Sequence, residues 1–280
     1  MGLLIINRWR YRPVRALKPY RPDRVERPVL KLKWFFSDYD GTLAPIDVPP
    51  GRSRIPRGVE GELRRIAARI PFAVITSKDF GFIHPRTSFA HAWACANGLE
   101  IRLSNGQVIT RGGLLDLRGA LSYVRKSLGG VRIEKKKDAS GRLMGFSIDW
   151  RKRRRPSSSI LGDILDSMRS QGFSVLHNGG EPFIDVFAAR TDKGEALVKL
   201  IKLMGLGRKA GIFVGDSPTD NLAFERSGIS VCVAHGQNLE GLKCKFIVDF
   251  RNMRGFLSSL LKNDLDFTPR LQSVHRVGDE

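Results

Sequence analysis

One stretch constrains the fold of this chain more than any other: the apolar residues WFF at 34–36 run straight into SDYDGTL at 37–43. An apolar run that stops at turn-forming residues predicts a buried strand. In open α/β sheets, ligands bind just beyond the carboxyl ends of strands, which is where Asp38 and Asp40 would lie. Two carboxylates this close repel each other unless a positive charge is shared between them. The stretch therefore predicts a strand that brings two acids, and a cation, to a binding site.

The pattern of an apolar strand that ends in polar residues recurs twice further along the chain. One strand ends in two hydroxyl groups, another ends in two acids, and a helix opens near a lysine; these polar residues are Thr76 and Ser77, Asp216 and Asp220, and Lys193. Because the parallel strands of a doubly wound sheet end at one edge, we expect these residues to meet there. The predicted fold class is therefore α/β, with a doubly wound, mostly parallel (Rossmann-like) sheet in the core.

The middle of the chain has a different residue pattern. Its predicted strands alternate apolar and polar residues or carry charge, and helices are expected around 114–128 and 158–171. One-sided patterning of this kind predicts a small antiparallel sheet with helices on one face. We interpret this segment as an α+β cap inserted into the core. The expected boundaries are a basic arm at 1–33, the core at 34–103 and 188–265, the cap at 104–187 and a polar tail at 266–280.

The chain is strongly basic, with a formal net charge of +20 over 280 residues, which suggests an anionic partner. Residues 1–33 hold ten Lys or Arg, two acids and four prolines. Such a segment cannot bury much apolar surface, so we expect an extended or disordered arm. Contact with nucleic acid is one interpretation of the arm. We favour a solvated tail, because no aromatic-basic binding module is visible in it.

The three cysteines, Cys95, Cys232 and Cys244, are odd in number and widely spaced. They form neither a disulfide framework nor a metal-ligand pattern, which favours a reducing compartment. No apolar run approaches the ~18 residues that a transmembrane helix requires, and the opening apolar residues are too few for a signal peptide. We therefore expect a cytoplasmic protein that makes no membrane contact. The sequence does not indicate its oligomeric state.

The polar residues at the expected sheet edge match the needs of phosphoryl transfer. A carboxylate can attack phosphorus to form an acyl phosphate. A second acid two residues further on can protonate the leaving alcohol and then activate water. Other carboxylates can hold Mg²⁺, which takes oxygen ligands. A lysine and a hydroxyl group can then offset and orient the charged oxygens of the phosphoryl group.

The same residues resemble the four ordered motifs of the haloacid dehalogenase superfamily of phosphatases, at residues 38–43, at Thr76, at Lys193 and at residues 215–220. The resemblance covers roughly residues 34–262. The insertion between the second and third motifs looks like the Cof-type (C2B) cap of that superfamily. Within this branch the chain is most similar to trehalose-6-phosphate phosphatases, through residues 38–46, 97–101 and 192–197 and through Thr219-Asp220 with Phe224.

The resemblance implies a role for each motif residue. Asp38 would be the nucleophile and Asp40 the general acid/base, with Lys193 as the third catalytic residue. The phosphate would be held by Thr76 and Lys193, with Ser77 as the alternative to Thr76 for the motif hydroxyl. Mg²⁺ would be bound by Asp38, by the backbone carbonyl of Asp40 and by Asp216, with Asp220 in support.

Departures from the trehalose-6-phosphate phosphatase pattern concern the substrate. That family usually has Ser-Gly-Arg where this chain has Thr76-Ser77-Lys78, a form more similar to mannosyl-3-phosphoglycerate phosphatases. The family's cap motif Glu-x-Arg-Pro corresponds to residues 185–188, where Asp185 keeps an acid for sugar hydroxyls and the arginine is absent. In the basic run 151–155, Arg151 is the best candidate for substrate contact, with nucleic acid or solvent as the alternatives. We assign the lysine run at 135–137 to solvent.

The sequence therefore predicts an enzyme, a Mg²⁺-dependent phosphomonoesterase that hydrolyses a sugar phosphate through an aspartyl-phosphate intermediate. A substrate like that of trehalose-6-phosphate phosphatases is the first choice. A mannosyl-3-phosphoglycerate phosphatase-like enzyme and a phosphosugar mutase are the enzymatic alternatives. The remaining alternative is a nucleic-acid-binding protein on a phosphatase-derived core.

Overall fold

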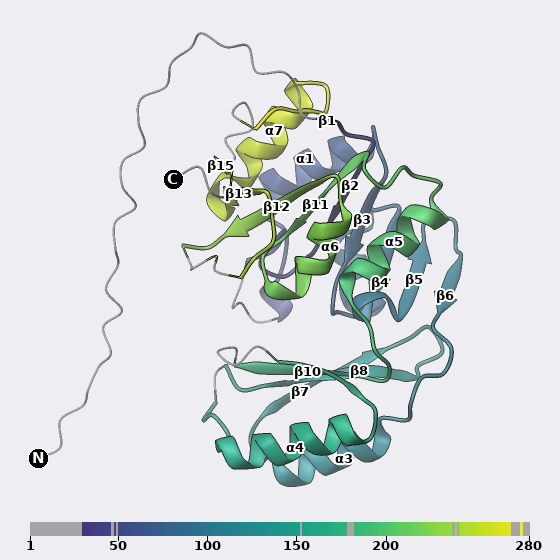
Figure 1. Ribbon diagram of the computed structural model, residues 1–280, viewed down its shortest axis with the longest axis vertical. Coiled ribbons are helices and arrows are strands. Elements are labelled where there is room, and N and C mark those ends of the chain that lie inside the picture. Colours follow the sequence, from purple (N-terminus) through teal and green to yellow (C-terminus); the bar gives the residue numbers. More distant parts are fainter. Residues whose placement is uncertain are drawn as a thin grey trace, which may run out of the picture.

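The computed structural model describes residues 30–45, 48, 50–151, 153–177, 182–236, 239, 241–269 and 275–276. A nine-stranded sheet forms the core, with the strand order β15-β13-β12-β11-β2-β3-β4-β5-β6 (Figure 1). Its strands are β2 (Trp34–Ser37), β3 (Phe72–Ile75), β4 (Ala92–Cys95), β5 (Glu100–Leu103), β6 (Val108–Thr110), β11 (Gly211–Gly215), β12 (Ile229–Ala234), β13 (Phe246–Asp249) and β15 (His275–Arg276). The run from β13 to β4 is parallel, and β5, β6 and β15 are antiparallel to their neighbours.

Helices cover both faces of the core sheet (Figure 1). One layer holds α1 (Arg57–Ala67) and α7 (Met253–Lys262), and the other holds α5 (Lys193–Leu203) and α6 (Asn221–Arg226). Because β2 is buried on both faces, its side chains are all apolar up to Ser37: Phe35 packs in the cluster with α1 and α7, while Trp34 and Phe36 pack in the cluster with α5 and α6. The short helix α2 (Phe80–Ile83) follows β3. The doubly wound, mostly parallel core sheet is therefore confirmed.

The cap is a four-stranded antiparallel sheet with the order β7-β8-β10-β9. Its elements are α3 (Arg118–Ser127), β7 (Arg132–Lys137), β8 (Leu143–Asp149), α4 (Ser158–Ser170), β9 (Ser174–Leu176) and β10 (Phe183–Phe187). The two helices cover the face of this sheet that lies away from the core, and the other face is turned toward the core (Figure 1). Alternation along β8 sends Phe146 and Ile148 to the helices and leaves Ser147 and Asp149 facing the core.

Three of the expected domain boundaries differ in the structure. Strand β6 pairs with β5 in the core sheet, so the core extends past residue 103. Strand β1 (Leu30–Lys31), in the expected arm, pairs with β14 (Asp266–Phe267), in the expected tail, and β15 adds to the edge of the core sheet. Strands of two or three residues are too short to show a periodic pattern in a sequence. The rest of the arm, residues 1–29, lies outside the described residues, so the solvated tail stays a prediction, with nucleic-acid contact as its alternative.

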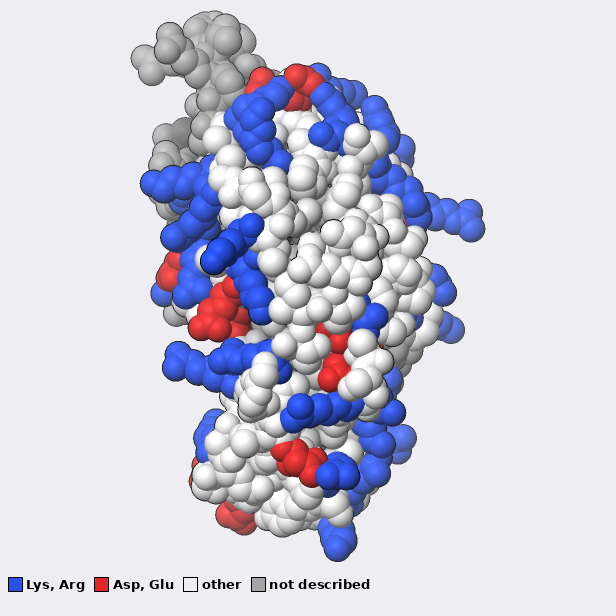
Figure 2. All heavy atoms as spheres, turned by 90° about the vertical axis from the view of Figure 1, so that its right-hand side faces the viewer, with Lys and Arg blue, Asp and Glu red and all other residues white. Residues whose placement is uncertain are grey.

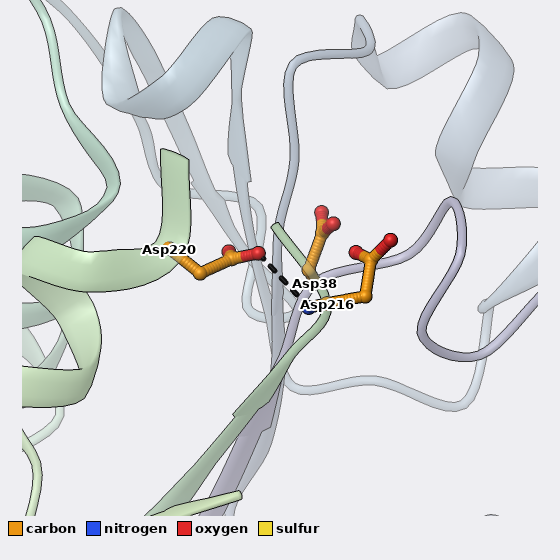
Figure 3. Close-up of side chains that lie close together, drawn as sticks. All are labelled: Asp38, Asp216 and Asp220. Carbon is orange, nitrogen blue, oxygen red and sulfur yellow. Dashed lines mark hydrogen bonds between the residues drawn. The ribbon is translucent and has the colours of Figure 1, made fainter. Parts of the chain in front are cut away.

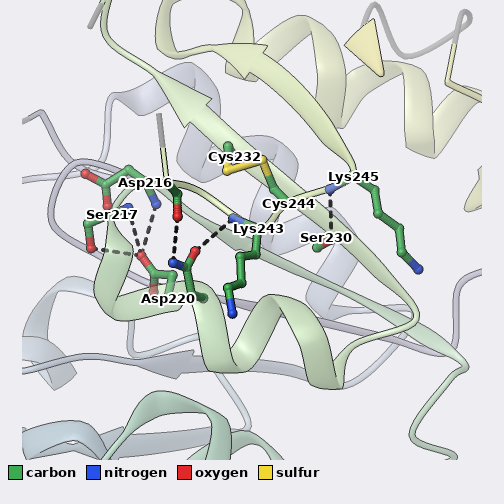
Figure 4. The surroundings of a disulfide bond; sticks show 10 residues. Asp216, Ser217, Asp220, Ser230, Cys232, Lys243, Cys244 and Lys245 are labelled. Atoms are coloured by element: carbon green, nitrogen blue, oxygen red, sulfur yellow. Dashed lines mark hydrogen bonds between the residues drawn. A yellow bond between two sulfur atoms is a disulfide. The ribbon is translucent and has the colours of Figure 1, made fainter. Parts of the chain in front are cut away.

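A disulfide joins Cys232 of β12 to Cys244, and this corrects the expectation that the cysteines are unpaired (Figure 4). The two Cα atoms are 5.7 Å apart although 12 residues separate them in sequence. Parallel pairing brings the chain entering β13 beside β12, as shown by the hydrogen bond from the Lys245 N–H to the Ser230 hydroxyl. Cys95 is a buried free thiol. The disulfide removes the argument for a reducing compartment that rested on unpaired cysteines.

Positive side chains are spread widely over the face of the molecule that Figure 2 shows. On the face shown in Figure 2, Lys and Arg side chains are spread over both core and cap, around a central area without charge, and do not gather in one stripe. The charge of this face therefore marks no single binding surface for a polyanion. Among the described helices, none combines the length and the apolar character needed to cross a membrane.

Candidate active site

Two neighbouring strands bring the predicted acids to one edge of the core sheet. Asp38 follows β2 and Asp216 follows β11, and the Asp38 N–H donates to the Val214 carbonyl at 2.9 Å, which continues the pairing of these strands. Gly41 lets the loop after Asp38 pass directly against Asp216. Its φ is +78°, and a Cβ at this position would lie 2.0 Å from the Asp216 Oδ2 atom. Glycine at this position is therefore what allows the two acidic loops to meet.

A cluster of three carboxylates lies at this edge. Ligand atoms from Asp38, Asp216 and Asp220 all lie within 4.8 Å of one another (Figure 3). The Lys193 ammonium lies 3.0 Å from Asp38 Oδ1 and 2.8 Å from Asp220 Oδ1. Thr42 donates its hydroxyl to Asp216 Oδ1 at 3.0 Å. One ammonium group therefore faces three carboxylates, so the cluster has an excess of negative charge.

The pKa values of these acids reflect that excess. Burial raises the pKa of Asp38 to about 7, which the charge of Lys193 opposes and the charge of Asp220 supports. Burial, followed by the charges of Asp38 and Asp220, raises the pKa of Asp216 well above its ordinary value. A divalent cation with a preference for oxygen ligands would relieve this repulsion, so the donor set fits the predicted Mg²⁺.

Asp220 holds the site together through both of its carboxylate oxygens. Its Oδ1 accepts from Lys193, and its Oδ2 accepts from the backbone N–H groups of Asp216 and Ser217 at 3.1 Å (Figures 3 and 4). The side chain is fully buried. Asp220 therefore fixes the lysine and the Asp216 loop, and the oxygens that remain for a cation are those of Asp38 and Asp216. The supporting role in metal binding that the family resemblance implied for Asp220 stays a prediction.

Asp40 lies beside this cluster and outside it. Its Oδ1 accepts from the Ser53 hydroxyl at 3.1 Å, and the Lys78 ammonium lies 3.8 Å from its Oδ2. The carboxylate is 39% exposed, compared with 8% for that of Asp38. The more buried acid and the more accessible acid therefore line the same cavity.

The cavity lies between the core and the cap and has a volume of about 400 Å³. The predicted site residues that line it are Asp38, Asp40, Ser77, Arg151, Asp185, Lys193 and Asp216. Thr76 does not line it, because its side chain is buried and its hydroxyl accepts from the Lys78 N–H at 3.2 Å. Of the two hydroxyls that end β3, the one at Ser77 therefore faces the cavity.

Cross-strand pairing arranges the cap side of the cavity in rows. Glu134 of β7, Ser147 of β8 and Asp185 of β10 stand opposite one another in register, and all three line the cavity. Asp185 accepts hydrogen bonds from Ser147 and Lys136. Burial alone would raise the pKa of Asp185, but the charge of Lys136 holds it below its ordinary value. Asp185 is therefore an ionised acid on the sheet face that meets the core.

Lys136 corrects the expectation that the lysine run at 135–137 lies in solvent. Its side chain is 1% exposed, pairs with Asp185, and lies over the Phe187 ring at 4.7 Å. Alternation along β7 explains the difference, since Lys135 and Lys137 remain exposed while Lys136 turns toward the cavity side. A run of like charges on a strand is therefore divided between two environments.

Arg151 is the member of the basic run that reaches the cavity. Its guanidinium pairs with Asp149 at 2.7 Å and lies 5.7 Å from the Phe183 ring centre. Arg153, Arg154 and Arg155 are exposed to solvent. The structure thus separates Arg151 from the three arginines at 153–155.

Known proteins share both the sequence and the fold of this chain. Residues 157–260 match the family described as haloacid dehalogenase-like hydrolase. A trehalose-phosphate phosphatase of Mycolicibacterium paratuberculosis is 26% identical over 222 residues, which cover 72% of this chain and 55% of that protein. In sequence the chain is thus similar to haloacid dehalogenase-like hydrolases and to trehalose-phosphate phosphatases. It spans about half the length of the curated relatives it matches.

Solved structures of other proteins share the fold of this chain. A trehalose-6-phosphate phosphatase related protein superposes with a TM-score of 0.60 at 22% identity, over 80% of this chain and 95% of the other. A sugar phosphatase of haloacid dehalogenase subclass IIB superposes with a TM-score of 0.61 at 14% identity, over 83% and 99% of the two chains. Since each match covers 80% or more of the chain, the predicted fold class is confirmed, and the predicted resemblance to haloacid dehalogenase phosphatases agrees with these matches.

Sequence reasoning gave no site role to several residues that line the cavity. Lys78 and Glu134 meet across it. Lys78 entered the sequence analysis only within the departure Thr76-Ser77-Lys78, and Glu134 carried no signal, because charged residues on a strand are common. Asn97 follows β4 with a φ of +54°, and its Oδ1 is the one buried side-chain nitrogen or oxygen without a partner among the described residues. Residues 97–101 entered the sequence analysis only as part of the family resemblance, and nothing in that match indicated a buried amide at the cavity.

Proposed function

We propose that this chain is a Mg²⁺-dependent phosphomonoesterase that hydrolyses a sugar phosphate. The observation that carries the proposal is the convergence of Asp38, Asp40 and Lys193 at the core end of a cavity that the cap closes. A buried nucleophile, a more accessible acid and a fixed ammonium group are the three parts that transfer of a phosphoryl group to a carboxylate requires. Enclosure by the cap would exclude bulk water from the reacting groups.

The reaction would proceed in two displacements. A carboxylate oxygen of Asp38 forms a bond to phosphorus as the bond between phosphorus and the sugar oxygen breaks, and Asp40 gives its proton to that oxygen. A water molecule then attacks the aspartyl-phosphate, gives a proton to Asp40, and frees Asp38 and inorganic phosphate. The Lys193 ammonium stabilises negative charge on the phosphoryl group. Mg²⁺ bound by Asp38, Asp216 and the Asp40 backbone carbonyl would supply further positive charge at the phosphoryl oxygens.

The first choice of substrate is a trehalose-6-phosphate-like sugar phosphate. Two observations support it: the similarity to curated trehalose-phosphate phosphatases, and the polar row of Glu134, Ser147 and Asp185, which offers hydrogen-bond acceptors to sugar hydroxyls. Arg151 at the cavity supports the second candidate, a mannosyl-3-phosphoglycerate phosphatase-like enzyme, because an arginine can bind the carboxylate of the glycerate group.

The test is an assay of the purified protein with Mg²⁺ on trehalose 6-phosphate, mannosyl-3-phosphoglycerate and glucose 6-phosphate. We expect release of inorganic phosphate, its loss when the metal is chelated, and its abolition in Asp38→Asn while the circular dichroism spectrum is unchanged. Isomer formation without phosphate release would instead identify a mutase. Unchanged turnover by Asp38→Asn would reject the proposed nucleophile. Binding of polynucleotides with a steep salt dependence, together with no turnover, would favour the nucleic-acid alternative.

A further inference from the structure

Lys78 is a core residue that contacts both the cap and the candidate acid. Its ammonium lies 2.9 Å from Glu134 Oε1 on strand β7 of the cap, and 3.8 Å from Asp40 Oδ2 in the core. The side chains of Lys78 and Glu134 are only 13% and 21% exposed. Lys78 also lies 5.1 Å from the Phe82 ring, which restricts where the ammonium can go. One buried cation thus joins the cap to the acid beside the nucleophile.

Both partners of this contact are charged in the folded protein. Burial would lower the pKa of Lys78, but the charges of Asp40 and Glu134 raise it above its ordinary value. Burial would raise the pKa of Glu134, but the charge of Lys78 lowers it. Ion pairs that are this well shielded from water respond strongly to the loss of one partner, because the other charge is left uncompensated.

The contact belongs to the edge along which the cap rests on the core. Two hydrogen bonds flank it, from the Lys137 N–H to Asp79 at 3.1 Å and from the Ala139 N–H to Glu100 at 2.7 Å. All of these cap groups lie on β7 or in the turn that follows it. If the cap moved away from the core, the pair between Lys78 and Glu134 would separate along with these bonds.

The cap partner also belongs to the row that faces a bound ligand. Glu134 stands directly opposite Ser147, which stands opposite Asp185. A ligand that contacts this row would therefore sit beside Glu134, while its phosphoryl group would lie near Asp38. On the core side, Asp40 is held by Ser53 through one oxygen and approached by Lys78 through the other.

We propose that Lys78 is a positioning residue that couples closure of the cap to the orientation of Asp40. In this proposal, which rests on the proposed phosphatase function, Glu134 engages Lys78 only when the cap lies on the core. Lys78, so held, keeps the Asp40 carboxylate directed into the cavity toward the leaving oxygen. The acid is then in place only when the cap has enclosed the substrate, so proton donation follows closure.

Two substrates with different leaving groups test this role. The first is the sugar phosphate of the panel above that the wild-type protein hydrolyses fastest, whose leaving alkoxide needs a proton. The second is p-nitrophenyl phosphate, whose leaving phenolate is stable without one. For Lys78→Met and for Glu134→Gln we expect kcat on the sugar phosphate to fall roughly 10-fold or more, since small misplacements of catalytic groups are costly. On p-nitrophenyl phosphate we expect a change of less than about 2-fold.

The pair should also act as a unit. We expect the double variant to lose no more than the stronger single variant, because each substitution removes the same interaction. Lys78→Arg keeps the charge and the reach, so it should recover most of the rate. The control is Lys243→Met, which breaks an exposed ion pair with Glu225 in the core and should match the wild type.

Three outcomes would overturn the proposal: equal losses on both substrates, additive losses in the double variant, or wild-type kcat values in both single variants. Equal losses would assign Lys78 a structural role only. The proposed function fails in a different way, with a wild-type protein that releases phosphate from none of the esters. An active wild type with unaffected variants rejects the coupling alone.

Discussion

The two ends of the cavity hold buried charge in different ways. At the core end Lys193 faces three carboxylates, so negative charge is in excess. At the cap end the buried cation Lys136 pairs with Asp185, and Ser147 also donates to that acid. A balanced pair stabilises a fold, whereas an unbalanced cluster stores repulsion that a ligand can relieve. The comparison suggests that the core end is arranged for chemistry and the cap end for a fixed surface.

The largest expected effect is the loss of the one ammonium at the core end. Lys193→Met should reduce phosphate release roughly 1,000-fold, because it removes a fixed positive charge from the reacting group. Phosphate release is the measurement, and circular dichroism checks that the variant is folded. Lys199→Met is the matched control, since Lys199 lies on the same helix but is exposed. A loss of less than about 10-fold would contradict the role of the ammonium group.

The second-largest expected effect concerns the disulfide in the core. Replacing Cys232 and Cys244 by serine should lower the free energy of unfolding by about 3 kcal/mol, the chain-entropy estimate for a short loop. Denaturant unfolding of the oxidised wild type and of the double variant measures this difference. Cys95→Ser controls for the loss of a buried thiol. If reducing agent leaves the wild-type midpoint unchanged, the bond makes no contribution to stability.

Breaking the balanced pair at the cap end should affect stability. Lys136→Met leaves the Asp185 carboxylate unpaired, and we expect a loss of about 2 kcal/mol in the free energy of unfolding. Lys135→Met on the same strand should stay within about 0.5 kcal/mol of the wild type, because that side chain is exposed. Equal effects of the two substitutions would contradict the balanced pair.

For the cluster of Asp38, Asp216 and Asp220 we expect the opposite effect, because the loss of one charge should increase stability. Asp216→Asn removes one of three repelling carboxylates and keeps an acceptor for Thr42, so the metal-free protein should gain about 1 kcal/mol. Phosphate release should fall at the same time, because a candidate metal ligand is lost. Thermal unfolding in a chelator, compared with the assay in Mg²⁺, measures both changes. A less stable variant would show that the cluster is not under electrostatic strain.

The smallest effect is a pH dependence at the junction of core and cap. The pKa of Glu134 is lower in the folded protein than its ordinary value of 4.5, because of Lys78. The ion pair with Lys78 therefore stabilises the fold above pH 4.5. This stabilisation is lost as the pH falls through the lower pKa that Glu134 has in the folded protein. The difference in unfolding free energy between wild type and Glu134→Gln should decrease as the pH is lowered below 4.5. If this difference in unfolding free energy does not change with pH, Glu134 stabilises the fold through packing contacts and not through its charge.

The core end could be predicted from the sequence because its determinants are local. Asp38 and Asp40 are set by one strand and one turn, and Asp216 by another, so strand ends alone bring them together. The cap end could not be predicted in the same way. Whether Lys136 points to solvent or to Asp185 depends on the register of three strands, which a short charged run does not reveal. The disulfide and the orphan amide of Asn97 likewise depend on contacts between segments that are distant in sequence.

The row of Glu134, Ser147 and Asp185 has a consequence for how such a protein can change. Each residue comes from a different strand, and the apolar side chains that hold those strands together point to the opposite face of the sheet. If the proposed function holds, ligand preference can thus be altered on this face while the apolar packing of the cap stays as it is. Glu134 and Asp185 are constrained by their ion pairs with Lys78 and Lys136. Ser147 carries no such pair, so a small library at that position would explore ligand preference with both ion pairs kept.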